Sequence, residues 1–191
     1  MRVWVLVAPL VVLAATSAAA QQQATVEGTA AEQTEPQPSA LAELDGLVGR
    51  WVDKGDDAVI TTDCEWTLNK RFLKRTFRVE TDGQTVLEGT QFVGWDPVAG
   101  HIRSWTFDSE GGVGQGVWIR DANRWLVKKS FVLADGRRAS AINVITVVDE
   151  NTIRWQSTNR EIDGELQPNV PEVTVVRQAD EASQANEEAS Q

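Results

Sequence analysis

Short runs of alternating apolar and polar residues, separated by turn residues, dominate the chain from residue 50 onward. Alternation with a period of two predicts half-buried β-strands, and Asp, Asn and Gly between the runs are typical of tight turns. The pattern predicts ten strands, at about 50–54, 58–67, 72–80, 85–95, 101–108, 113–120, 124–133, 137–148, 152–161 and 172–177. No connector is long enough for a crossover helix, so neighbouring strands should pair antiparallel in a meander.

The central hairpin, within Leu87–Gly112, shows the pattern most clearly, with its turn at Asp96-Pro97-Val98-Ala99-Gly100. Pro97 presets the φ of a type I turn, and Gly100 is predicted to take the left-handed conformation that closes the loop. A four-residue loop would place Phe92 opposite Trp105 and Thr90 opposite Phe107. The other face of this hairpin would then carry Val93, Trp95 and Ile102 together with Gln91, Ser104 and Thr106.

Closure of the sheet explains how so many strands avoid two long exposed edges. The predicted fold is therefore all-β, an up-and-down antiparallel barrel of about ten strands, with a two-sheet sandwich as the alternative. A short helix should precede it, because Leu41, Leu44, Leu47 and Val48 fall at helical spacing after Ser39, a candidate N-cap. In a barrel such a helix is expected to lay its leucines over one mouth.

The two ends of the chain differ from the barrel region, 41–177. Residues 1–20 combine Arg2, an apolar run and Ala18-Ala19-Ala20, which predicts a signal peptide cleaved before Gln21. The alternative, an uncleaved membrane anchor, is less favoured because the apolar run is short for a spanning helix. Residues 21–40 and 178–191 are polar and predicted to be disordered. We therefore expect an exported protein, periplasmic or extracellular, without stable membrane insertion after cleavage.

Charge and composition limit the partners, metals and cofactors that we expect. The formal net charge is −10, seven acidic residues lie in the two polar ends, and no basic stripe is visible, so nucleic acid is not expected as a partner. Cys64 and His101 are the chain's single cysteine and histidine, which gives no cluster for a metal and no motif for a cofactor. Cys64 lies mid-strand and is interpreted as a buried, inert thiol, with a reactive thiol as the alternative.

Several motifs resemble known barrels. Gly49-Arg50-Trp51 after a short helix resembles the glycine-x-tryptophan opening of the lipocalin and fatty-acid-binding superfamily. Gly94-Trp95-Asp96-Pro97, Ile102–Asp108 and Trp155–Thr158 resemble an uncharacterised lipocalin-like domain of secreted planctomycete-type bacterial proteins, often found beside SnoaL-like domains. The resemblance spans residues 41–177 and implies a lipocalin-like barrel without a known activity. The Arg-x-Tyr carboxylate site of the fatty-acid-binding branch does not carry over, because the chain has no Tyr.

Candidate ligand-binding residues come from tryptophans and from polar residues that interrupt apolar strands. The polar set is Arg75, Gln91, Arg103, Lys129, Asn143, Gln156 and Asn159, and about half of it should face outward. Any member that faces inward needs a partner, and a bound polar group is one such partner. We select Gln91, Arg103 and Asn143, with Trp105 and Trp155, as the candidate ligand site. The alternative is that the tryptophans simply fill a solid core.

Three functions remain open at this stage. The first is an exported domain that binds a small, partly apolar or amphiphilic molecule in the barrel. The second is a non-catalytic accessory or interaction domain with a solid core, and the third is a hydrolase or isomerase. No catalytic residues are assigned, because the chain has no Gly-x-Ser-x-Gly elbow and no Ser-His-Asp set with plausible geometry.

Overall fold

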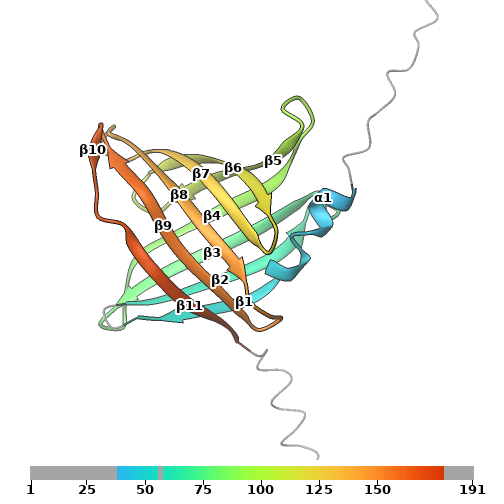
Figure 1. Cartoon of the computed structure of the whole chain (residues 1–191). Helices are drawn as coiled ribbons and strands as arrows, with labels where there is room; N and C mark the ends of the chain where they lie inside the picture. The colour runs from blue at the N-terminus through green and yellow to red at the C-terminus, as the bar shows by residue number, and fades with distance from the viewer. Residues whose placement is uncertain (1–37, 56–57, 179–191) are drawn as a thin grey trace, which may run out of the picture. The chain divides into compact units, whose positions relative to one another are not determined.

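The structure is a computed structural model that describes residues 38–55 and 58–178 (Figure 1). Ten strands form a closed antiparallel barrel in which each strand pairs with its neighbours in the chain, and β11 returns to β1. The predicted all-β barrel is thus confirmed. The barrel strands are β1 (Gly49–Lys54), β2 (Val59–Thr67), β3 (Phe72–Thr81), β4 (Gln84–Asp96), β5 (His101–Asp108), β6 (Val113–Asp121), β7 (Arg124–Val132), β8 (Arg138–Val147), β9 (Thr152–Ile162) and β11 (Val170–Gln178).

One further strand lies outside the barrel and was not predicted. β10 (Glu165–Leu166) pairs with the end of β9. The chain reverses at Asp163 and Gly164, which both have positive φ, as an Asp-Gly hairpin turn requires. The segment between the predicted strands 152–161 and 172–177 therefore begins as a tight hairpin.

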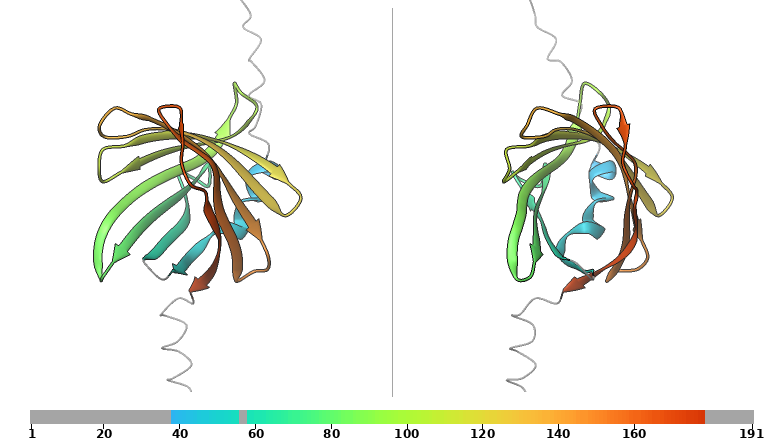
Figure 2. Two further views of the ribbon diagram at one scale, coloured as in Figure 1. Left: turned by 60° about the vertical axis from the view of Figure 1, so that its left-hand side comes forward. Right: turned by 90° about the vertical axis from the view of Figure 1, so that its left-hand side faces the viewer.

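A short helical segment lies across one end of the barrel, as Figure 2 shows. It consists of α1 (Pro38–Ala42) and the 3-10 helix η1 (Asp45–Leu47). Leu41, Leu44 and Leu47 are buried in the barrel core, which confirms the predicted helix and its role. The helix begins at Pro38, so Ser39 lies within it and is not its N-cap.

The central hairpin has the predicted register. Asp96 pairs with His101, so the loop has four residues, and Phe92 opposes Trp105. Gly100 has a φ of +69°, and its N–H donates to the Asp96 carbonyl at 2.8 Å. The buried face carries Val93, Ile102, Ser104 and Thr106, which fixes this face as the interior of the barrel.

The interior is most densely packed at the helical end. Leu73, Val93 and Ile102 meet the helical leucines there, and Trp118 packs edge-on against Trp125 with ring centroids 5.8 Å apart. The apolar cluster therefore closes the helical end of the barrel.

The predicted signal peptide and most of the predicted linker and acidic tail lie outside the described residues. Within residues 38–55 and 58–178, no helix combines the length and apolar character needed to cross a membrane.

Candidate functional site

A cavity of about 250 Å³ lies inside the barrel. Strand residues reach it from both halves of the sheet, and Leu47 of η1 lines it from the helical end. Three tryptophans, Trp51, Trp118 and Trp155, also line it. An engineered apolar cavity of about 150 Å³ accepts benzene, so a space of this size suits a ligand of one or two rings or a short acyl chain.

Contacts within the protein fix the position of Trp51 in the cavity wall. Trp51 is buried, and its Nε1 donates to the Leu47 carbonyl at 2.9 Å. The Arg177 guanidinium lies over the Trp51 ring at 4.2 Å and also bonds to the Val48 carbonyl. Trp51 is therefore fixed between the helical segment and the last strand, and it gives the cavity a rigid apolar wall.

A polar row forms part of the cavity wall on β3, β4 and β5. Arg75, Gln91 and Thr106 are direct cross-strand partners. Arg75 Nη1 donates to Gln91 Oε1 at 2.8 Å, and Gln91 Nε2 donates to Thr106 Oγ1 at 3.0 Å and Ser104 Oγ at 3.2 Å. The amide of Gln91 is thus fully oriented, and it holds the arginine side chain in place.

A second cation, Lys129 of β7, also lines the cavity. Its Nζ lies 5.8 Å from the centre of the Phe131 ring, and no described residue forms a hydrogen bond or ion pair with it. Burial, reinforced by the Arg75 charge and opposed by that of Asp108, lowers the pKa of Lys129 to about 8. The charge of Arg75 therefore acts on Lys129, and both residues line the same cavity.

Acidic groups near this pair are few. Asp53 is the one carboxylate among the lining residues, and burial raises its pKa. On β2, Asp53 pairs with Ile60, whereas Arg75 pairs with Cys64. Ile60 and Cys64 are four residues apart along that strand. That offset is about 13 Å along the strand. Asp53 thus lies toward the end of the cavity away from the helical segment and forms no ion pair with Arg75.

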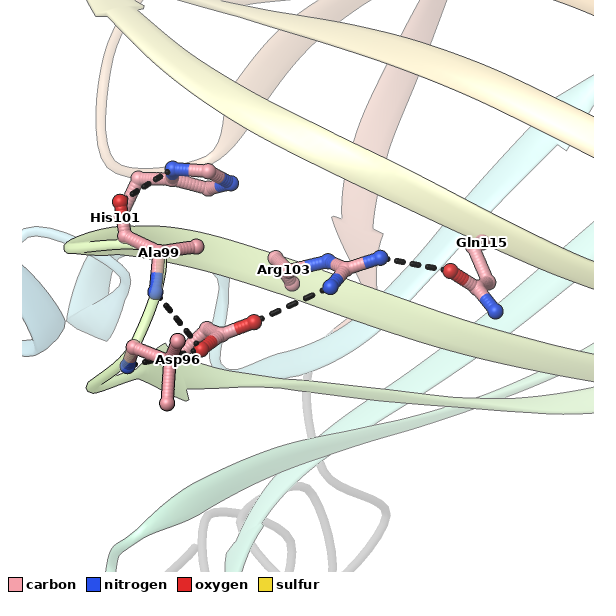
Figure 3. A network of polar contacts seen from close by, with 6 residues as sticks. Asp96, Ala99, His101, Arg103 and Gln115 are labelled. Atoms are coloured by element: carbon pink, nitrogen blue, oxygen red, sulfur yellow. Dashed lines mark hydrogen bonds and ion pairs between the residues drawn. The ribbon is translucent and has the colours of Figure 1, made fainter.

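The thiol and the imidazole do not form a reactive pair. Cys64 is buried in the barrel, and burial raises the pKa of its thiol while the nearby Arg75 charge opposes that rise. His101 is instead at the outer turn, where its Nδ1 lies 3.0 Å from the Ala99 carbonyl oxygen (Figure 3). This arrangement agrees with the interpretation of Cys64 as an inert core thiol.

The structure brings three of the five candidate ligand-site residues to the cavity: Gln91, Asn143 and Trp155. The other two, Arg103 and Trp105, do not line it. They alternate along β5 with the buried Ile102, Ser104 and Thr106, so they occupy the outer face of the sheet. Figure 3 shows Arg103 between Asp96 and Gln115. Its Nη1 donates to Asp96 Oδ2 at 3.0 Å, and its Nη2 donates to Gln115 Oε1 at 2.6 Å.

Sequence reasoning named Arg75 and Lys129 as interruptions of apolar strands but did not select them. The alternation of inward- and outward-facing residues along each strand is the signal that identifies them. Arg75 falls two residues after Leu73 and two before Phe77, and Lys129 continues the alternation of Trp125 and Val127. The same parity argument places Trp118, which was not selected either, on the inner face of β6.

Comparison with known proteins adds no assignment. A scan against protein-family models finds no match, and a search of curated proteins finds none. In the described part of the chain, no group of three or more His, Cys, Asp and Glu residues is placed to hold a metal ion.

Proposed function

We propose that this protein binds a small, partly apolar molecule inside the barrel. The observation that carries the proposal is the cavity itself, which has three tryptophan walls and one polar row. Ligand sites are typically apolar clefts with a few convergent polar groups that set the orientation of the ligand. A barrel packed as a solid interaction domain would need neither the space nor the buried polar row.

The polar row supports binding more than a purely structural role. Buried hydrogen-bonding side chains are costly unless each is satisfied, and an apolar core of the same volume would avoid that cost. Arg75, Gln91 and Thr106 nevertheless point into the space rather than to the surface. We further propose that the protein acts after export, from the sequence of residues 1–20.

The binding test uses decan-1-ol as a neutral apolar probe and decanoate as its anionic counterpart. Trp51, Trp118 and Trp155 line the cavity, so saturable binding should shift or quench tryptophan emission. Binding to the folded state should also raise the melting temperature by mass action. If neither probe gives a saturable change, the proposal is contradicted.

A matched pair of variants localises the binding. Thr62 lines the cavity, whereas its neighbour Thr61 lies on the outer face of β2. Thr62→Phe should fill the space and abolish binding of either probe that the parent protein binds, while Thr61→Phe should leave binding unchanged. Equal effects of the two substitutions would place any bound probe outside the barrel.

A further inference from the structure

The charges and unpaired donors of the cavity indicate which class of ligand it takes. Resting on the proposed binding function, we infer that the ligand is an amphiphilic carboxylate whose head group lies between Arg75 and Lys129.

Two cations face the cavity without a counter-ion. Among the described residues, neither Arg75 nor Lys129 forms an ion pair. Asp108 is the acid whose charge acts on Lys129, but its carboxylate accepts from the backbone N–H groups of Glu110 and Gly112, and it does not line the cavity. Both cations are half-buried, and a charge that is partly removed from water gains from an opposite charge, so an anion would complete the site.

The fully buried side-chain atoms of the cavity that lack a hydrogen-bond partner are both donors. Arg75 Nε and Trp118 Nε1 are buried without a hydrogen-bond partner, and both residues line the cavity. The Arg75 guanidinium also lies 5.9 Å from the Trp118 ring centre, so the two donors come from neighbouring side chains. A ligand that only accepts hydrogen bonds would match this set, whereas an amine or a second cation would not.

The carboxylate is the acceptor that fits best. Gln91 occupies Nη1 of Arg75 and fixes the plane of the guanidinium, which leaves the rest of a planar fork for a two-oxygen partner. Lys129 adds a compact point charge from the facing strand. The apolar walls at Trp51, Trp155 and Ile60 then receive the body of the ligand, so the class is an amphiphile rather than a free inorganic anion.

The test compares decanoate with decan-1-ol at pH 7 on the full mature chain. The parent protein should bind decanoate at least about 10-fold more tightly than the alcohol, because only the carboxylate pairs with the half-buried cations. Arg75→Gln and Lys129→Gln should each weaken decanoate binding by about 10- to 100-fold and change alcohol binding by less than about 3-fold. Arg103→Gln, on the outer face, should change neither.

The outcomes separate the two proposals. If the parent binds both probes equally, the carboxylate inference is overturned while the binding proposal stands. If neither probe binds, both are overturned. Should Arg75→Gln not fold, Lys129→Gln decides alone, since an unchanged preference for decanoate in that variant contradicts the inference.

Discussion

Two arginines on opposite faces of the barrel wall have nearly the same neighbours. Inside, Arg75 bonds to Gln91 and lies 5.9 Å from the Trp118 ring centre. Outside, Arg103 bonds to Gln115 and lies 6.0 Å from the Trp105 ring centre. In both guanidinium groups Nε is buried and unpartnered.

The difference between them is one carboxylate. Arg103 pairs with Asp96 at 3.0 Å, and the backbone N–H of Ala99, followed by Arg103 itself, lowers the pKa of that acid. Arg75 donates to the side-chain amide of Gln91 and has no acidic partner among the described residues. The outer cluster therefore has its counter-ion within the fold, whereas the inner cluster has none among the described residues, and our proposal supplies that counter-ion as a ligand.

The largest expected effect separates the two tryptophans of these clusters. Trp118 is buried, and Trp118→Ala should cost about 3–5 kcal/mol of unfolding free energy because it leaves a large hole in the core. Trp105→Ala, on the outer face, should cost only about 1 kcal/mol. Urea unfolding of both variants measures the contrast, and equal losses would show that the inner wall is not part of a tightly packed core.

A substitution that gives Arg75 an acidic partner should remove the difference between the inner and the outer cluster. Gln91→Glu places a carboxylate beside Arg75 and should reduce decanoate affinity by about 10- to 100-fold, since the chain then provides its own anion. Gln115→Glu makes the same change beside Arg103 and should leave decanoate binding unchanged. Calorimetric titration measures both, and a Gln91→Glu protein that retains full affinity would count against the inner anion site.

The lysine of the inner cluster predicts a pH dependence of stability. The charged and titratable groups that act on Lys129 are Arg75 and Asp108, and its pKa is lowered to about 8. Below pH 8 the lysine is charged in both the folded and the unfolded state, and its charge lowers the free energy of unfolding. As pH rises from 8 to about 10.5, the lysine loses its proton in the folded state before it does so in the unfolded state, so the folded state gains stability.

Lys129→Met should therefore stabilise the ligand-free protein at pH 7 by about 1–2 kcal/mol, because it removes that cost from a half-buried cation. The gain should shrink as pH rises from 8 toward 10.5. Thermal unfolding of both proteins at pH 7 and pH 10 measures the difference. A gain that is constant with pH would mean that Lys129 titrates normally.

The smallest expected effect concerns the turn that carries the outer acid. Asp96 Oδ1 accepts from the backbone N–H groups of Val98 and Ala99, and Gly100 closes the loop at positive φ. Gly100→Ala should cost about 1 kcal/mol, whereas Val98→Ala, at a side chain 96% exposed, should cost much less. Equal shifts of the urea midpoint would contradict this account of the turn.

The sequence predicted the barrel well because its signals are local. Period-two alternation and turn residues placed every barrel strand within two residues of its ends, and a four-residue loop after Asp96 specified the pairing of Phe92 with Trp105. The short β10 was not predicted, although the Asp163-Gly164 dipeptide before it favours a hairpin.

The candidate site was predicted only in part, for a physical reason. A strand shows which residues share a face, but not which face is interior when both carry aromatic residues. On β5 the outer face holds the large Trp105 and the charged Arg103, while the interior holds the smaller Ser104 and Thr106. That Arg75 and Lys129 line the same cavity depends on barrel closure, which no local pattern encodes.

The most direct measurement is the ionisation of a bound carboxyl group. Decanoate labelled with ¹³C at its carboxyl carbon reports that ionisation through its chemical shift, and opposite charges nearby favour the charged form. We expect the pKa of the bound carboxyl to fall below its value in water, and to return toward that value in Lys129→Gln but not in Arg103→Gln. A bound carboxyl that titrates as it does in water would contradict the claim that its head group lies between Arg75 and Lys129.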